Sequence, residues 1–358
     1  MKRAPRLMFS FLCSALLVFV GGCLEINTTT EVHTDGSLMR TVVISGDSSN
    51  IYSGPYTIPL DTTWAREIRK VDSRKFELTA TKDFADVEAM NAALRGNEDT
   101  TLAIRAGLEK SFQWFFTTYR YSETCKRYNA IQTVPYTDFI SAQELESFLR
   151  HEVEKEPFAS RGDSLALDDA SDRFDEWVKR NLFEAFYALF KKGLLSVPGI
   201  SISPAEVDAR EDTVFARAGE YFESGKFYDG KKMERIQRIL EKIFGVREAK
   251  AGLRAMEPEF DRMKRQLEFQ EEVGANTYRV SVIVPGLVTG TNARSLEGNK
   301  ATWEDFMPYC YLKDYQLWVE SRVINWWAVV VTGVVVVALA ALLLASSVRR
   351  RRTVAVPG

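Results

Sequence analysis

Hydrophobic and polar positions alternate along the chain immediately after Cys23. One face carries apolar or threonine side chains: Leu24, Ile26, Thr28, Thr30 and Val32. A period of two is typical of a half-buried β-strand. Asp35-Gly36 is a hairpin turn signal that precedes a second stretch of the same kind. The pattern predicts a strand over 24–32 and a return strand over 38–45.

Further strand patterns follow before residue 135. Residues 76–80 and 102–108 alternate between apolar and polar side chains. Residues 112–121 carry bulky aromatic side chains on both faces, which predicts one long strand buried on both sides, with its rings in the core rather than on a ligand platform. Short helices are predicted over 64–70 and 83–95.

The middle of the chain changes to helical spacing. Ser141-x-x-Glu144 and Ser203-Pro204-Ala205-Glu206 are capping-box sequences, which mark helix N-termini. Gly193 is expected to end a helix, and Pro258 is expected to break or kink another. Residues 138–272 are therefore predicted to form a helical block.

Strand periodicity returns over 278–284. The predicted fold class is α+β, a mostly antiparallel β domain with a helical insertion and one C-terminal transmembrane helix. An insertion is favoured over three consecutive modules because the short return segment could hardly bury a core alone. The expected division of the ectodomain is a β-rich part at 23–134, a helical insertion at 135–275 and a β-rich return at 276–325.

The N-terminus has the pattern of a secretory leader. Basic residues (Lys2, Arg3, Arg6) precede an apolar run over 7–20. Val20-Gly21-Gly22-Cys23 resembles the lipobox of bacterial lipoproteins, which implies a signal peptide at 1–22 and acylation of Cys23 with chains such as palmitate. The alternative is a plain secretory signal with an incidental cysteine.

The C-terminus has the pattern of a membrane span. Trp326–Val348 contains no charged residue and as a helix would be roughly 35 Å long, enough to cross a bilayer core of about 30 Å. Trp326 and Trp327 suit an interfacial aromatic belt. Four arginines follow directly and indicate a cytoplasmic tail at 349–358: Arg349, Arg350, Arg351 and Arg352. A buried core helix is the alternative.

The two ends agree on one topology. Cys23 would sit on the outer leaflet, and the span would exit inward, so residues 24–325 would be extracytoplasmic. The expected location is the bacterial cell membrane, with a periplasmic ectodomain if the cell has two membranes. The expected lipid contacts are the acylated Cys23 and the transmembrane helix.

Charge is unevenly distributed. Seven of the 47 basic residues and none of the 49 acidic residues lie in 1–23 and 326–358, so the segment between carries a net charge of −9. An acidic ectodomain argues against nucleic acid as a partner. The chain has 358 residues, and its 46% hydrophobic content suffices for a core and excludes wholesale disorder.

Two cysteines remain in the ectodomain besides Cys23. Cys125 follows the aromatic run, and Cys310 lies between the last strands and the span. A disulfide between them would join the two ends of the helical insertion, and the compartment is expected to be oxidising. The alternative is two unpaired thiols, since spacing alone cannot establish a disulfide.

The search for catalytic chemistry finds no candidate residues. His151-Glu152 lacks the second histidine of a zinc-protease motif, and His33 falls on the polar face of the first strand. No nucleophile elbow occurs, and the glycines around Lys226 do not have P-loop spacing. No catalytic residue, metal ligand or cofactor is therefore predicted.

A second aromatic cluster lies close to the predicted span, at Tyr309, Tyr311, Tyr315 and Trp318. Such rings favour the headgroup level of a membrane, so this edge of the ectodomain is a candidate for lipid contact. The alternative is an ordinary strand beside an aromatic belt.

Two segments carry a resemblance to a known family. The first runs from the lipobox Cys23 into the hairpin at Asp35-Gly36. The second contains Val282-x-x-Pro285-Gly286, Thr291-Asn292, Gly298-Asn299, Trp303, Asp314-Tyr315, Ser321 and Asn325-Trp326. Together they resemble the bacterial LppM-like membrane-anchored lipoproteins, which implies a lipid anchor, an α+β ectodomain, one C-terminal transmembrane helix and an envelope or lipid-contacting role.

The expected function is that of a non-enzymatic envelope lipoprotein whose ectodomain binds a protein partner or lipid. A lipid-binding module would have an enclosed apolar cavity in its β part, whereas a scaffold would expose an apolar helical face. The alternative is an envelope hydrolase with a carboxylate-based site, which a pair of buried acids with shifted pKa values in one pocket would favour.

Overall fold

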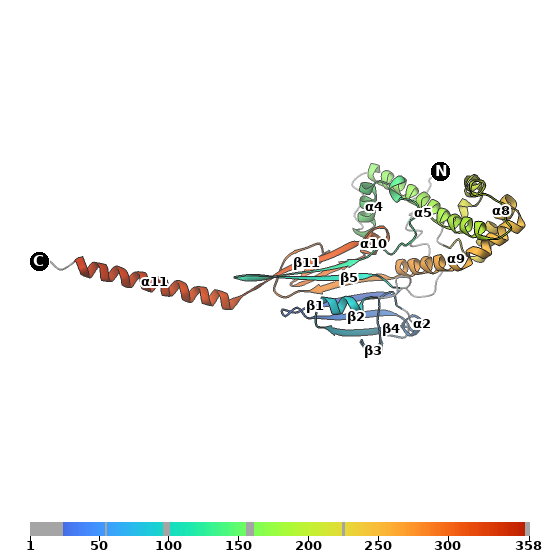
Figure 1. Cartoon of the computed structure of the whole chain (residues 1–358). Coiled ribbons are helices and arrows are strands. Elements are labelled where there is room, and N and C mark those ends of the chain that lie inside the picture. Colours follow the sequence, from blue (N-terminus) through green and yellow to red (C-terminus); the bar gives the residue numbers. More distant parts are fainter. Residues whose placement is uncertain (1–23, 54–55, 96–100, 155–160, 224–225, 355–358) are drawn as a thin grey trace.

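The structure, a computed structural model, confirms the α+β class, with a helical insertion in a mostly antiparallel β domain and one long apolar C-terminal helix (Figure 1). It describes residues 24–53, 56–95, 101–154, 161–223 and 226–354, and of residues 151–165 and 347–354 no side chain is described. Cys23 and the rest of the predicted leader lie outside the described residues.

Sheet A has seven strands in the order β3-β4-β2-β1-β7-β10-β9. Their bounds are β3 Ala65–Lys70, β4 Lys75–Phe84, β2 Leu38–Asp47, β1 Glu25–Val32, β7 Thr277–Ile283, β10 Lys300–Glu304 and β9 Ser295–Glu297. The central pair β1 and β7 is parallel, and the other pairs are antiparallel. A parallel pair needs a long connection, which β2 to β6 and the helical block supply. The predicted alternation in β1 is confirmed, with Ile26, Thr28, Thr30 and Val32 buried.

Sheet B has four antiparallel strands in the order β5-β6-β11-β8. Their bounds are β5 Ile104–Gln113, β6 Phe116–Cys125, β11 Tyr315–Ile324 and β8 Leu287–Thr291. The inner faces of the two sheets share one hydrophobic core, to which sheet A contributes Val42 and Val282, and sheet B contributes Leu317 and Val319. The short helices α2 (Ser48–Ser53) and α3 (Val87–Ala93) contact the strands.

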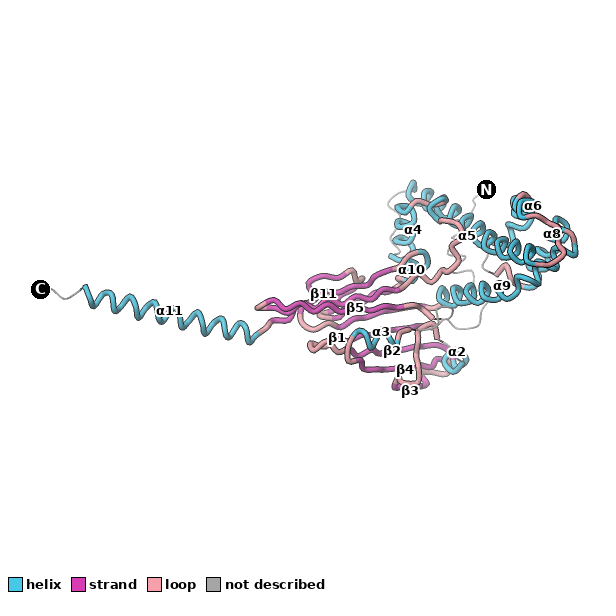
Figure 2. The backbone as a smooth tube through the Cα atoms, viewed as in Figure 1, coloured by secondary structure: helices cyan, strands magenta, loops and turns pink. Residues whose placement is uncertain are grey.

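The helical block lies at one end of the two sheets (Figure 2). Its elements are η2 Tyr136–Asp138, α4 Ala142–Glu154, α5 Arg161–Ser196, α6 Pro204–Asp208, α7 Glu211–Ala218, η3 Gly219–Phe222, α8 Gly230–Phe244 and α9 Val246–Ala275. Both predicted capping boxes are present, at Ser141 with Glu144 and at Ser203 with Glu206. The block has its own core, which the paired helices α5 and α9 form with phenylalanines such as Phe186 and Phe190.

The last two helices lie at opposite ends of β11. Helix α10 (Met307–Leu312) precedes β11 and packs against the helical block. Helix α11 (Trp326–Val354) follows β11 and extends away from the ectodomain (Figure 1). Its segment Trp326–Ser346 is long and apolar enough to cross a membrane, and almost none of it is buried against the protein.

Several local predictions are wrong. Residues 65–70 form strand β3 and not a helix, because they pair with β4 over the register Ala65↔Thr81 to Lys70↔Phe76. Gly193 does not end α5, which continues to Ser196. Pro258 does not break α9, which runs through it from Val246 to Ala275, and the kink stays a prediction. A β-carbon at Gly193 would lie 2.7 Å from the Gly252 carbonyl oxygen, so Gly193 permits a close helix crossing.

The prediction of one long aromatic strand over 112–121 is also wrong. Residues 112–113 end β5, Trp114 and Phe115 form the turn, and Phe116 begins β6. The chain therefore reverses inside the aromatic run. Four of these rings are exposed rather than buried on both sides, with Phe112 at 59%, Trp114 at 47%, Phe115 at 41% and Phe116 at 40%.

Candidate functional site

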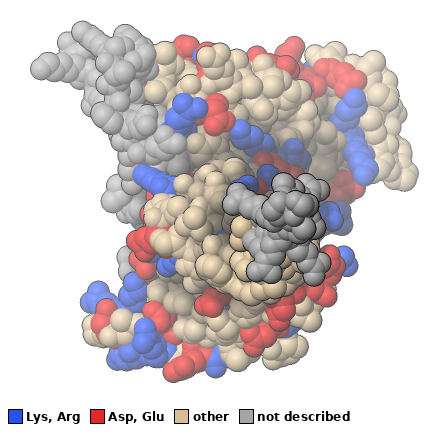
Figure 3. Space-filling model, turned by 90° about the vertical axis from the view of Figure 1, so that its left-hand side faces the viewer, with Lys and Arg blue, Asp and Glu red and all other residues tan. Residues whose placement is uncertain are grey.

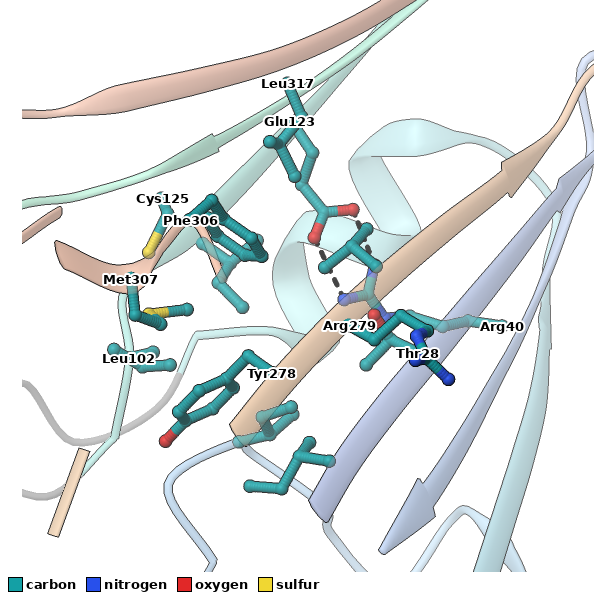
Figure 4. Close-up of a pocket in the computed structure, with 14 residues that line it drawn as sticks. Thr28, Arg40, Leu102, Glu123, Cys125, Tyr278, Arg279, Phe306, Met307 and Leu317 are labelled. Atoms are coloured by element: carbon teal, nitrogen blue, oxygen red, sulfur yellow. Dashed lines mark hydrogen bonds and ion pairs between the residues drawn. The ribbon is translucent and has the colours of Figure 1, made fainter. Parts of the chain in front are cut away.

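A buried ion pair joins the two sheets. Arg40 of β2 and Glu123 of β6 occupy inward-facing positions of their strands, and both are at most 2% exposed. Arg40 Nη1 donates to Glu123 Oε2 at 2.8 Å, and Arg40 Nη2 donates to Oε1 at 3.0 Å (Figure 4). The Tyr121 hydroxyl donates to the same carboxylate at 3.0 Å. The pair is therefore bidentate and hydrogen-bonded, as a buried pair needs to be.

The ion pair fixes the charge state of Glu123. Burial alone would raise the pKa of this carboxyl, but the Arg40 guanidinium and the hydrogen bonds outweigh burial and hold the pKa below its ordinary value. The same contact raises the pKa of Arg40, although burial opposes it. Glu123 is thus held as a carboxylate, which does not suit a general acid.

The ion pair lines a small cavity between the sheets. The cavity measures about 20 Å³, which is room for about one water molecule. Its walls are mostly apolar and include Leu317, Tyr278 and Met307, with Thr28 and Arg40 on the polar side (Figure 4). Ligand clefts are usually about 300–1,000 Å³, so this cavity does not enclose a lipid.

The sequence contained a signal for this pair that the search for motifs missed. Arg40 interrupts the apolar face that Leu38, Val42 and Ile44 share, and Glu123 stands between the inward residues Tyr121 and Cys125. A charged side chain of each sign on the inner face of a strand points to a cross-sheet partner, because an unpaired buried charge is costly.

The two ectodomain cysteines are brought together. Cys125 ends β6, Cys310 lies in α10, and both thiols are buried and free of a disulfide. The Cys125 thiol donates to the Lys126 carbonyl at 3.8 Å, the Cys310 thiol donates to the Phe306 carbonyl at 3.9 Å, and the Tyr128 N–H donates to the Cys310 carbonyl at 3.0 Å. Burial, together with the Cys125 thiol, raises the pKa of Cys310. The disulfide stays a prediction, and the fold satisfies its first requirement, proximity.

The predicted membrane-interface tryptophans lie where β11 passes into α11. Trp326 is 68% and Trp327 is 55% exposed, and Phe112 and Trp114 of sheet B contact the Trp327 ring at 6.1 and 5.4 Å between centroids. Seen from the side to which α11 projects, acidic and basic side chains are interspersed among uncharged residues (Figure 3). Arg349–Arg352 lie in the last turns of α11, and their side chains lie outside the described residues.

The second aromatic cluster is not where the sequence suggested. Tyr309 and Tyr315 stack at 4.9 Å between ring centroids, at the start of β11. Tyr309 and Leu312 belong to a core shared with α4 and α5, at the end of β11 that is far from α11. The expectation of headgroup contact at Tyr309, Tyr311 and Tyr315 is therefore wrong.

The first residue after Cys23 is fixed at the end of sheet A that is far from α11. Leu24 is 7% exposed, and its N–H donates to Asn276 Oδ1 at 3.1 Å, directly after α9. β1 and β7 run in parallel from this end, and the chain after β7 reaches the last residues of β11 through the pair Leu287↔Arg322. Leu24, the first described residue, and α11 therefore lie at opposite ends of the sheets.

Comparisons with known proteins add little. No protein-family model and no curated protein sequence matches the chain. Among solved structures, the NMR structure of the folded domain of Mycobacterium tuberculosis LppM is similar, with 9% identity and a TM-score of 0.28 over 86% of this chain and 95% of that domain. A TM-score this low carries no argument about fold or function.

Proposed function

We propose that this chain is a bacterial envelope lipoprotein that is acylated at Cys23, crosses the cell membrane with α11 and has no enzymatic activity. The observation that carries the proposal is α11, an apolar helix of spanning length that extends away from the ectodomain with almost none of its span buried (Figure 1). An apolar helix of this length with almost no buried surface needs lipid around it. Tryptophans at its start and arginines at its end support an extracytoplasmic ectodomain.

Metabolic labelling tests the acylation. Cells that express the chain are fed an alkyne fatty acid, and the purified protein is examined for label. We expect Cys23→Ala to abolish labelling and Cys13→Ala to leave it unchanged, because Cys13 lies in the segment that would be removed. Equal labelling of the wild type and of Cys23→Ala would overturn this part of the proposal.

Thiol accessibility tests the topology. Ser73→Cys places a thiol on an exposed turn of the ectodomain, and Thr353→Cys places one after the arginines. A membrane-impermeant maleimide is expected to label position 73 in cells with an opened wall, and to label position 353 only after the membrane is permeabilised. The reverse pattern would contradict the orientation.

We propose a protein rather than an enclosed lipid as the partner of the ectodomain. The cavity of about 20 Å³ holds no acyl chain. The described helices of the helical block expose few large hydrophobic side chains, Leu195 at 37% and Val246 at 55%. The block lies at the end of the sheets far from α11, where a partner beyond the membrane can reach it (Figure 1). Photocrosslinking from position 246, with Ile68 on β3 as the control position, is expected to give a specific adduct only from position 246.

The cavity beside the Arg40–Glu123 pair gives the hydrolase alternative no support. Glu123 is paired with Arg40 and held as a carboxylate, so the cavity does not contain two acids that share a proton. No second function is therefore proposed.

A further inference from the structure

The tip of the β5–β6 hairpin, residues 112–116, forms an exposed apolar surface beside the start of α11. Apart from Gln113 its residues are aromatic and at least 40% exposed. Ile324 at the end of β11 is 43% exposed, and Leu287 at the start of β8 is 73% exposed. The register Ile324↔Phe116 and Arg322↔Leu287 places these two residues at the same end of sheet B as the tip. The hairpin tip, Ile324 and Leu287 together are the apolar patch.

Asn325 fastens the hairpin tip to the start of α11. Its backbone N–H donates to the Phe115 carbonyl at 2.9 Å, and its side-chain amide donates to the carbonyls of Gln113 at 3.1 Å and Trp114 at 3.3 Å. Asn325 Oδ1 accepts from the Thr117 hydroxyl at 2.9 Å. Asn325 thus bonds three backbone carbonyls and one hydroxyl of the turn and holds the turn against α11.

The hairpin tip reaches along α11 beyond its first turn. Trp114 Nε1 donates to the Thr332 hydroxyl at 2.9 Å. Thr332 lies six residues after Trp326, which is roughly 9 Å along the helix axis. Inside a bilayer every polar group needs a partner from the protein, and this hydrogen bond supplies one for the indole N–H. If Trp326 lies at the interface, the Trp114 ring lies deeper than the interface.

Charge is absent from the hairpin tip itself. Residues 111–118 contain no ionisable side chain. Behind the tip, Arg120 lies opposite Glu109 of β5 and Glu320 of β11, whereas Lys110 lies opposite Tyr119 and Arg322 lies opposite Thr118. Lys110 Nζ donates to the Thr34 carbonyl at 2.7 Å. The uncharged patch therefore suits the apolar interior of a membrane interface.

We propose that the hairpin tip inserts into the outer leaflet of the bilayer that α11 crosses, as a second membrane contact of the ectodomain. The inference rests on the proposed membrane span and adds a lipid-binding surface to it. The partner is lipid because the tip contacts Trp327 and Thr332, two residues of the span itself. Lipid that surrounds those residues also surrounds the tip. The tip then holds the ectodomain upright on α11.

Depth-dependent fluorescence quenching tests the proposal. The mature chain 24–358 is produced behind a secretory signal that is cut without acylation, and it is reconstituted in vesicles of phosphatidylcholine and phosphatidylglycerol. Single cysteines at Phe115→Cys, Val330→Cys and Ser73→Cys carry an environment-sensitive nitrobenzoxadiazole probe, and doxyl-labelled lipid is the quencher. Phe116→Cys is a second tip site in case Phe115→Cys does not fold, as judged by circular dichroism. The unmodified chain controls for labelling of the buried Cys125 and Cys310.

Each outcome has one meaning. We expect the probe at 115 to be blue-shifted and quenched by doxyl lipid at least half as strongly as the probe at 330, with no change at high salt, while the probe at 73 stays unquenched. Quenching at 330 without quenching at 115 would overturn the insertion and leave the span intact. No quenching at 330 would overturn the span itself. A blue-shifted probe at 115 that lipid does not quench would assign the patch to a protein neighbour or a second copy, and would also overturn the proposal.

Discussion

The buried pair Arg40–Glu123 is the most testable single contact of the fold. Arg40→Met keeps most of the volume and leaves a carboxylate without its partner inside the core. Breaking such a pair costs about 3–5 kcal/mol of unfolding free energy. We expect a loss of this size at neutral pH in urea unfolding followed by circular dichroism. Arg69→Met, at a surface pair whose arginine side chain is 66% exposed, is the matched control and is expected to cost at most about 1 kcal/mol.

The pH dependence of the Arg40→Met variant follows from the lost partner. In the wild type the pKa of Glu123 is lowered, so its contribution is present above the unfolded pKa of about 4.3 and is lost as pH falls through the folded pKa. Without Arg40, burial raises the pKa of Glu123, so the folded variant binds a proton that the unfolded chain releases. The difference in unfolding free energy between the wild type and the variant is therefore expected to become smaller as the pH falls from 7 to about 4. If this difference in unfolding free energy did not change with pH, the variant would have lost packing rather than the partner of a buried charge.

The contact between Cys125 and Cys310 predicts a disulfide in an oxidising compartment. The two thiols would give two electrons to a disulfide such as oxidised glutathione by thiol–disulfide exchange, which releases two glutathione thiols. Because the bond closes the loop that contains the helical block, we expect about 2–4 kcal/mol of added stability. Peptide mapping without reductant is expected to recover the linked peptides. Full alkylation of both thiols in protein from the oxidising compartment would contradict the prediction.

At the scale of elements, the α5–α9 crossing depends on a pair of glycines. A β-carbon at Gly193 would lie 2.7 Å from the Gly252 carbonyl oxygen and 3.0 Å from the Met256 nitrogen, whereas one at Gly230, at the start of α8, would meet nothing within 4 Å. We expect Gly193→Ala to destabilise the block by about 1–3 kcal/mol and Gly230→Ala to stabilise it by about 0.5–1 kcal/mol. Hydrogen exchange of α5 and α9 measures both effects. Equal protection in the two variants would refute the tight crossing.

Periodicity predicted elements well where one face of a strand or helix meets a single core. The alternation in β1 and the capping boxes at Ser141 and Ser203 are set by neighbours within a few residues, so the sequence displays them. Gly193 shows where prediction from local sequence fails. The same residue type ends helices and permits close crossings, and its partner Gly252 lies far along the chain.

The hairpin tip is a second place where prediction from local sequence fails. Aromatic residues on both faces normally indicate burial on both sides, and no Gly, Asn or Pro marks the turn at Trp114-Phe115. The turn is held by Asn325, more than two hundred residues away, so local sequence did not display it. The Arg40–Glu123 pair is an intermediate case. Each position is visible in its strand pattern, but the sequence does not show that the two strands face each other.

At the scale of the whole molecule, the two predicted anchors are joined to opposite ends of the sheets. Cys23 is bonded directly to Leu24, whose position is fixed. The seven-residue strand β7 and the ten-residue strand β11 extend roughly 23 and 33 Å from that end towards α11. An upright ectodomain therefore holds Leu24 well above the bilayer that α11 crosses. Acyl chains on Cys23 can enter this bilayer only if the sheets tilt towards the membrane plane, which pulls the hairpin tip away from Asn325 and Thr332.

Acylation and insertion of the tip are therefore expected to compete. The probe at position 115 should be quenched less by doxyl lipid in the chain acylated at Cys23 than in the unacylated chain 24–358, because the acyl chains tilt the ectodomain. The probe at 330 should be quenched equally in both, since α11 crosses the bilayer in either state. Equal quenching at 115 would mean that the acylated ectodomain stays upright. The acyl chains would then not be in the bilayer that α11 crosses, and double anchoring in one membrane would be wrong.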